Sequence, residues 1–244
     1  MRVALFVTCL VDQFFPSVGV ATVRLLRHLG LEIDFPQRQT CCGQPGYNAG
    51  FPEYARPLAR RTIELFEPYD AVVLPSGSCA AMLRQGYANL FRDQAEWQRR
   101  AHALAEKTYE LAEFLVRVLG RVELAARFPA RVTYHDSCHA LRGLRLKEEP
   151  RRLLGAVEGL ELVEMEASEV CCGFGGIFAV DFADISTAMA EDKLAAIERT
   201  GADCVVSSDS GCLMQIGSRL RRRRSRVRPL HLAELLAEGI ERRA

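Results

Sequence analysis

Nine cysteines stand out among the residues of this 244-residue chain that could do chemistry. They include two adjacent pairs, each followed by glycine: Cys41-Cys42-Gly43 and Cys171-Cys172-Gly173. Adjacent cysteines form a disulfide only with strained geometry. Residues 3–11 are apolar and follow Arg2, but Asp12 comes next, where a signal peptide would need small residues for cleavage. We therefore expect a cytoplasmic, reducing location, in which so many thiols indicate metal binding or redox chemistry.

The cysteines recur in the same order in two halves of the chain, which indicates a tandem repeat. Three segments of the first half align with three of the second: 3–9 with 132–138, 70–79 with 203–212, and 110–115 with 231–236. Each copy carries four cysteines at nearly the same spacing: Cys9, Cys41, Cys42 and Cys79 form the first quartet, and Cys138, Cys171, Cys172 and Cys212 form the second. We predict two homologous domains, 1–120 and 128–244.

Alternating strand and helix patterns position these quartets. Continuous apolar runs predict buried strands, and apolar residues spaced near 3.6 predict helices. The expected strands are 3–7, 31–35, 71–74, 131–134, 160–163, 204–207 and 227–229, and the expected helices include 17–29, 57–66 and 185–200. Such alternation is typical of α/β folds, so each domain is predicted to be a small parallel sheet flanked by helices. The cysteines then follow the carboxyl ends of strands, where ligands gather in such sheets.

Soft thiolates in sets of four favour either an iron–sulfur cluster or zinc. The chain has no Cys-x2–4-Cys knuckle of the kind that builds structural zinc sites, and adjacent thiolates point in different directions, which suits several irons better than one ion. We predict two [4Fe–4S] clusters held by the eight cysteines, with zinc in one site as the alternative. The ninth cysteine, Cys204, aligns with Ala71 at the start of a strand and is expected to be buried rather than to bind metal.

Two histidines flank Cys138, at positions where the first copy has Phe6 and Leu10. His135 and His139 are therefore candidates for metal ligation, proton transfer or a hydrogen bond to sulfur. Asp136 is expected to cap the helix that follows. Catalytic residues are otherwise unknown from the sequence.

Charge and hydropathy exclude other classes of function. The chain has 32 basic and 31 acidic residues, and the net charge of +1 is too small for a general nucleic-acid or membrane surface. No apolar run approaches the length of a membrane span. Seven arginines lie within residues 219–228, which fits either the solvated end of a helix or a docking patch for an acidic redox partner.

These motifs resemble the cysteine-rich CCG domain of the B component of heterodisulfide reductase, of the glycolate oxidase iron–sulfur protein and of the lactate-utilisation protein A family. The chain is most similar to the last of these, which has two such domains and little else. The resemblance covers nearly the whole chain and is carried by Cys9, Cys41-Cys42-Gly43-Gln44-Pro45-Gly46, Pro75-Ser76-Gly77-Ser78-Cys79, His135-Asp136-Ser137-Cys138-His139, Cys171-Cys172-Gly173-Phe174-Gly175-Gly176 and Cys212. The fuller motif ends in Cys-x-x-Cys, whereas Met82 and Gln215 stand at its last positions here.

The resemblance to the lactate-utilisation protein A family implies an iron–sulfur electron-transfer subunit of a complex that oxidises L-lactate, a 2-hydroxy acid, to pyruvate. It implies two partners, a ferredoxin-like iron–sulfur subunit and a third lactate-utilisation protein, and an oxidoreductase that is inactive without them. Two alternatives stay open: a disulfide or thiol reductase component of the heterodisulfide reductase type, and a zinc-binding scaffold protein. The missing final cysteines favour an ordinary [4Fe–4S] cluster over the richer ligation of the reductases.

Overall fold

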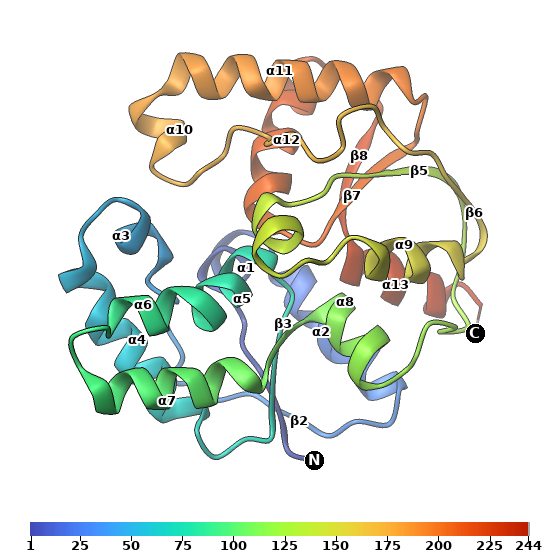
Figure 1. Ribbon diagram of the computed structural model, residues 1–244. Coiled ribbons are helices and arrows are strands. Elements are labelled where there is room, and N and C mark those ends of the chain that lie inside the picture. The colour runs from blue at the N-terminus through green and yellow to red at the C-terminus, as the bar shows by residue number, and fades with distance from the viewer. Residues whose placement is uncertain (244) are drawn as a thin grey trace.

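Two four-stranded parallel sheets, each flanked by helices, make up the computed structural model, which describes residues 1–243 (Figure 1). The first copy contains, in order, β1 (Val3–Leu5), α1 (Cys9–Phe14), α2 (Pro16–His28), β2 (Ile33–Asp34), α3 (Gln44–Asn48), α4 (Pro52–Phe66), β3 (Ala71–Leu74), α5 (Gly77–Ala81), η1 (Met82–Gly86), α6 (Tyr87–Leu90), α7 (Ala95–Glu106), β4 (Thr108–Glu110), α8 (Leu111–Glu113) and η2 (Phe114–Val118). The second copy contains β5 (Arg127–Tyr134), η3 (His139–Gly143), α9 (Glu148–Gly155), β6 (Glu158–Leu162), α10 (Phe178–Asp181), α11 (Ala183–Arg199), β7 (Cys204–Ser207), α12 (Ser210–Arg222), β8 (Arg228–His231) and α13 (Leu232–Glu241). This is the predicted α/β architecture with two tandem domains.

The strand order is the same in both sheets, β2-β1-β3-β4 in the first and β6-β5-β7-β8 in the second. Every pair of neighbouring strands is parallel. Val3 pairs with Ala71, and Val132 pairs with Cys204, so equivalent strands share the register that the repeat alignment indicates. Because all strands of a sheet run the same way, their carboxyl ends meet at one edge, where the cysteines follow.

The strands agree with the predicted positions, and the differences lie in the shorter elements. β3 and β7 have the predicted bounds, whereas β5 begins earlier than expected because residues 127–130 pair with β6 through an irregular register. β4 was not predicted, because Thr108-Tyr109-Glu110 contains no apolar run. It pairs only with β3 and forms the sheet edge that corresponds to β8 in the second copy.

One hydrophobic core joins the two copies. Val3 and Val73 of the first sheet belong to the same buried cluster as Val132 and Val206 of the second. Helices α2 and α13, one from each copy, pack against each other across this junction (Figure 1). The copies therefore share the apolar surface whose burial stabilises them. The domain bounds 1–120 and 128–244 stay a prediction.

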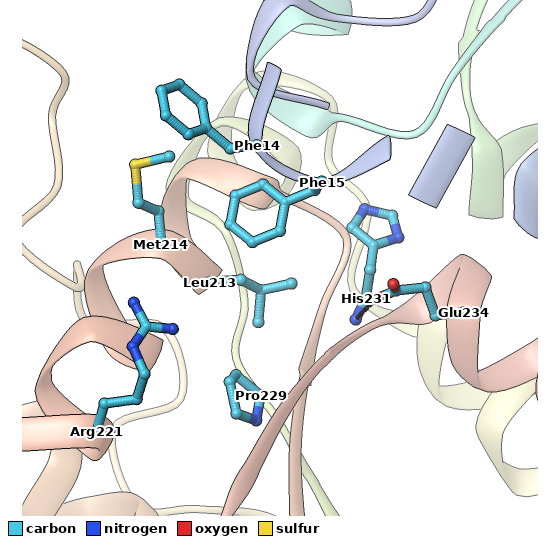
Figure 2. Close-up of a pocket in the computed structure, with 8 residues that line it drawn as sticks. All are labelled: Phe14, Phe15, Leu213, Met214, Arg221, Pro229, His231 and Glu234. Carbon is cyan, nitrogen blue, oxygen red and sulfur yellow. Dashed lines mark hydrogen bonds between the residues drawn. The ribbon is translucent and has the colours of Figure 1, made fainter. Parts of the chain in front are cut away.

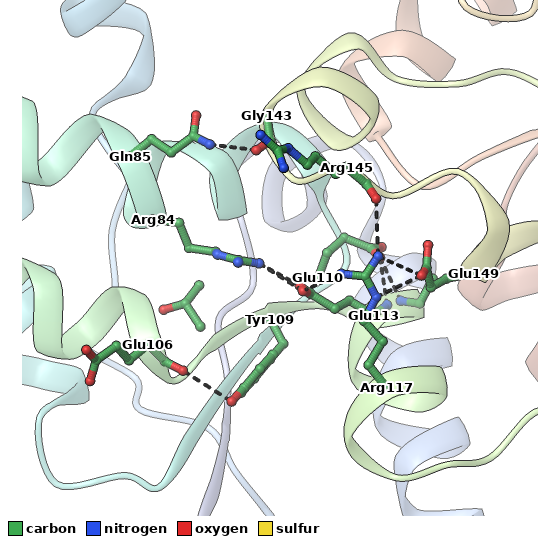
Figure 3. Close-up of polar contacts among 12 residues, drawn as sticks. Arg84, Gln85, Glu106, Tyr109, Glu110, Glu113, Arg117, Gly143, Arg145 and Glu149 are labelled. Carbon is green, nitrogen blue, oxygen red and sulfur yellow. Dashed lines mark hydrogen bonds and ion pairs between the residues drawn. The ribbon is translucent and has the colours of Figure 1, made fainter.

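Polar contacts reinforce the junction (Figure 3). The Arg117 guanidinium in η2 donates to the Glu149 carboxylate in α9 at 2.7 Å and to the Arg145 carbonyl at 3.1 Å. The Gln85 amide donates to the Gly143 carbonyl at 2.5 Å. Each of these contacts joins the first copy to the second, so together they fix how the copies are oriented.

Glu110, at the end of β4, is fully buried beside this network. One carboxyl oxygen caps α8 by accepting hydrogen bonds from the backbone amides of Ala112 (2.7 Å) and Glu113 (3.3 Å). The other oxygen is buried and has no hydrogen-bond partner in the described residues. Loss of hydration on burial raises the pKa of Glu110 to about 8. The side chain is therefore neutral in the folded protein below that pH.

We expect stability to fall as the pH rises through this range. The folded state binds a proton on Glu110 between the ordinary carboxyl pKa and about 8, whereas the unfolded chain releases it. At pH 9 this titration lowers the free energy of unfolding by about 3–5 kcal/mol, and the effect is absent below about pH 4.5. Glu110→Gln removes this titration, so urea unfolding should show the variant to be more stable than the wild type at pH 9 and similar at pH 5.

A matched variant distinguishes the titration of Glu110 from the loss of an ion pair. Glu113→Gln breaks the ion pair with Arg84, whose closest N–O distance is 2.8 Å, and should lower stability at every pH where the carboxylate is charged. If the stability of Glu110→Gln falls with rising pH as steeply as that of the wild type, a group other than Glu110 causes the pH dependence.

Candidate metal centres

The first quartet gathers at the carboxyl edge of the first sheet. Cys9 begins α1 after β1, Cys79 lies in α5 after β3, and Cys41 and Cys42 lie in the loop before α3. The sulfur atoms of Cys9 and Cys41 are 3.7 Å apart, and those of Cys42 and Cys79 are 3.4 Å apart. Cys42 and Cys79 are buried, whereas Cys9 and Cys41 are half-buried. The quartet therefore has a buried side and a side open to solvent.

The second quartet has the equivalent placement. Cys138 immediately precedes η3, Cys212 lies in the first turn of α12, and Cys171 and Cys172 lie in the loop between β6 and α10. The sulfur atoms of Cys172 and Cys212 lie within 4.8 Å of each other, and the thiols of Cys138 and Cys171 influence each other's pKa. Again the second cysteine of the pair and the last cysteine are buried, and the other two are half-buried. The structure thus brings together the four cysteines of each predicted quartet.

A left-handed glycine follows each cysteine pair. Gly43 has φ of 83° and Gly173 has φ of 85°, a conformation that side chains with a Cβ rarely adopt. The backbone amide of Gly43 donates to the sulfur of Cys41 at 3.4 Å, and that of Gly173 donates to Cys171 at 3.4 Å. A Cβ on Gly173 would lie 2.5 Å from the Ser186 carbonyl oxygen. Glycine is therefore required here both for the turn and for the amide to reach sulfur.

The close packing of sulfurs makes some thiols of each quartet acidic. Hydrogen bonds from Cys42 and Cys9 lower the pKa of Cys41 to about 3, and the same contacts raise the pKa of Cys9 and Cys42. In the second quartet the neighbouring thiols, Cys138 first, lower the pKa of Cys171 to about 2, and Cys172 lowers that of Cys212 to about 7. A metal cation would have to displace the protons of the remaining thiols.

The donor set fits a metal group. Four thiols at one sheet edge are the ligands that iron–sulfur clusters and zinc prefer. A tetrahedral zinc site with bonds of about 2.3 Å would place all its sulfurs about 3.8 Å apart. Within residues 1–243, three donor residues lie mutually within 4.8 Å in one place, formed by His135, Cys172 and Cys212. In the first quartet the two short sulfur distances, 3.7 and 3.4 Å, lie within the pairs Cys9–Cys41 and Cys42–Cys79.

Cys204 is separate from both quartets, as the repeat alignment predicts. It begins β7, is 5% exposed, and belongs to the core that joins the copies. Cys172 and Cys212 belong to a different buried cluster on the other side of the second sheet. Burial raises the pKa of Cys204, which keeps its thiol neutral.

The two candidate histidines differ in environment. His139 is half-buried, and its Nδ1 atom lies 3.7 Å from the sulfur of Cys138. His135 is fully buried, and neither ring nitrogen has a hydrogen-bond partner in the described residues. The expectation that Asp136 caps a helix is wrong. Its two carboxylate oxygens accept hydrogen bonds from the Arg151 guanidinium at 2.9 and 2.8 Å, because burial at this corner favours a charged partner.

Asp209 links the two quartets and was missed by the sequence analysis. One carboxylate oxygen accepts a hydrogen bond from the backbone amide of Ser78 at 2.8 Å and from the Ser76 hydroxyl at 3.3 Å. The other accepts from the amide of Gly211 at 3.1 Å and so caps α12. The side chain therefore joins the turn before Cys212 to the turn before Cys79. Its position as the N-cap of a helix was the available signal.

A pocket lies where α1 of the first copy meets α12 of the second (Figure 2). Its volume is about 390 Å³, and its lining residues are Phe14, Phe15, Leu213, Met214, Arg221, Pro229, His231 and Glu234. Leu213 and Met214 directly follow Cys212 in α12, so the pocket adjoins the helix that carries a cysteine of the second quartet. The lining combines apolar side chains with the charged Arg221 and Glu234, which lie on opposite sides of the pocket.

The arginine run of residues 219–228 spans the end of α12 and the start of β8. Arg223 forms ion pairs with Glu191 and Glu198 of α11, and Arg228 pairs with Glu238 of α13 at 3.0 Å. Part of the run therefore ties helices together within the second copy. Among the helices of residues 1–243, none has both the length and the apolar character needed to cross a membrane.

Comparison with known proteins is consistent with this geometry. The family model described as a cysteine-rich domain, CCG, matches the chain twice, at residues 3–84 and 132–217. Among solved structures, a hypothetical protein from Helicobacter pylori superposes on 98% of this chain with a TM-score of 0.65 at 14% identity. This chain covers 49% of that protein, so the likeness concerns the fold alone.

Curated relatives match over the full length. Lactate utilization protein A 2 from Bacillus cereus (strain 03BB102) is 46% identical over 242 residues, which cover 99% of this chain and 100% of the relative. Lactate utilization protein A from an Exiguobacterium species is 48% identical and covers 98% of each chain. With two matches to the cysteine-rich domain and full-length relatives at this identity, the chain belongs to the lactate utilization protein A family.

Proposed function

We propose that this protein is the iron–sulfur electron-transfer subunit of a complex that oxidises L-lactate to pyruvate. The observation that carries the proposal is the pair of cysteine quartets, each gathered at the carboxyl edge of its own sheet. The names of the full-length relatives supply the pathway, lactate utilisation. The site supplies the type of chemistry, since thiolate quartets hold [4Fe–4S] clusters.

Eight cysteines would hold two [4Fe–4S] clusters, which pass single electrons when bound. The residues of the chain itself set the surroundings. The amides of Gly43 and Gly173 donate to cysteine sulfur, and such hydrogen bonds raise the reduction potential. The half-buried members of each quartet, such as Cys41 and Cys171, mark the side from which electrons would enter or leave.

Partner subunits are part of the proposal. Oxidation of a 2-hydroxy acid removes two electrons, commonly as a hydride, and clusters accept electrons singly, so the reaction needs a hydride acceptor besides this chain. We propose a ferredoxin-like iron–sulfur subunit and a third lactate-utilisation protein as the partners. One observation supports the alternative function, a zinc-binding scaffold protein: His135, Cys172 and Cys212 form a compact group.

We expect about eight irons and eight acid-labile sulfides per chain after anaerobic purification, because each copy has its own quartet. Metal analysis together with electron paramagnetic resonance of the dithionite-reduced protein checks this. A value near four irons with one zinc would assign zinc to one copy. Zinc alone, in protein that was never exposed to air, would favour the scaffold protein and overturn the proposal.

Substitutions should distinguish Cys204 from the eight cysteines proposed as cluster ligands. Cys204→Ala removes a small group from the shared core and should cost about 1 kcal/mol of stability, with the iron content unchanged. Cys212→Ser should lose or convert the second cluster and leave the first, and Cys79→Ser is the matched change in the first copy. Loss of iron from Cys204→Ala but not from Cys212→Ser would show that the ligand assignment is wrong.

The isolated chain should not oxidise L-lactate with a soluble dye as electron acceptor, even with both clusters present. Addition of the two partner subunits should give lactate-dependent reduction of the clusters, seen as bleaching of their visible absorbance. Pyruvate formation by the chain alone, at a rate similar to that of the complete complex, would contradict the role of a pure electron carrier.

A further inference from the structure

The two metal centres differ at one buried position. Phe6 follows β1 and His135 follows β5, and both side chains are fully buried. The repeat aligns these residues, and each lies three residues before the first cysteine of its quartet. Phe6 packs on Phe66 with ring centroids 5.3 Å apart, as a core residue does. In the second copy an imidazole with two nitrogen atoms stands at the same place.

His135 lacks the contacts that a buried histidine ordinarily makes. Its backbone amide donates to the Val206 carbonyl at 2.8 Å, as part of the sheet. Both ring nitrogens are buried, and neither has a hydrogen-bond partner among the described residues. An unsatisfied buried polar group costs about 1–3 kcal/mol, so such a group in a native protein calls for an explanation.

The atoms nearest to this imidazole that could explain it are sulfurs. A ring nitrogen of His135 and the sulfurs of Cys172 and Cys212 all lie within 4.8 Å of one another, and all three residues are buried. Two ligands at tetrahedral angles on one metal, with bonds of about 2.1 and 2.3 Å, are separated by about 3.6 Å. The three donors are therefore near enough to bind one metal group.

We propose that a ring nitrogen of His135 binds directly to the metal group of the second copy, beside the thiolates of Cys172 and Cys212. The proposal rests on the proposed iron–sulfur function. It makes the two centres chemically different: the first has thiolate ligands only, whereas in the second centre one iron has a neutral nitrogen donor beside its thiolate. The half-buried His139, near Cys138, is not part of the donor set.

The proposal has a consequence for electron transfer. An imidazole differs from a thiolate in charge and donor strength, and ligand identity is one of the properties that set the reduction potential of an iron–sulfur centre. The second centre should therefore accept an electron at a potential different from that of the first. Replacement of His135 by phenylalanine, the residue that the first copy has naturally, should move the second potential towards the first.

The test uses the full chain, reconstituted anaerobically with ferrous iron and sulfide. Pulsed electron paramagnetic resonance on protein made with natural and with ¹⁵N-labelled histidine should detect a strongly coupled histidine nitrogen at one cluster. The signal should vanish in His135→Phe and persist in His139→Phe, the matched control. A redox titration of the same samples should show a shift of the second potential towards the first in His135→Phe alone.

The remaining outcomes each decide the question. Full iron and sulfide content without a strongly coupled histidine nitrogen in the wild type would overturn the ligand role of His135 and leave the proposed function standing. A nitrogen signal that is lost in His139→Phe instead would also overturn it. Protein that incorporates no iron and sulfide would overturn the proposed function and this inference together. Where His135→Phe does not fold, labelling of the wild type and of His139→Phe decides the point, because a signal that persists without His139 leaves His135 as the histidine beside the cysteines.

Discussion

Pairwise crowding of cysteine sulfurs at the end of a parallel sheet is the constraint on which the structure depends. Sulfur contacts of 3.7 and 3.4 Å in the first quartet disfavour four negative charges, so the pKa of Cys41 is lowered and those of Cys9 and Cys42 are raised. A bound cation removes this conflict, which couples metal binding to the local fold. The left-handed turns at Gly43 and Gly173 serve the same end, since they aim amides at sulfur.

The junction between the copies also joins the two candidate metal centres. The turn before Cys79 and the turn before Cys212 share hydrogen bonds through Asp209. A Cβ on Gly77 would lie 2.6 Å from the Cβ of Ala140, so α5 of the first copy lies directly against η3 of the second. The two turns that carry Cys79 and Cys212 are therefore tied to each other by short contacts.

The sequence predicted the features that depend on local pattern. Apolar runs predicted β3 and β7 with their correct bounds, and the matched spacing of the repeat indicated that Cys212, rather than Cys204, belongs to the second quartet. It did not predict β4, whose three residues form a strand only because β3 offers an open edge. Nor did it predict the partners of Asp136 and Asp209, because Arg151 and Ser78 reach them only after the chain has folded. Contacts between copies leave no periodic signal along the chain.

Comparison of equivalent positions shows where the two copies diverge. The cysteine quartets and left-handed glycines are the same, but the buried groups around them are not. Ser76 in the first copy corresponds to Asp209 in the second, and Glu110 corresponds to His231; both members of each pair cap a helix. Charge and hydrogen bonding around a cluster set its potential, so on the proposed function these unequal surroundings would add to the difference in potential between the two centres. Such a difference would give electrons a direction through the molecule, which a symmetrical repeat would lack.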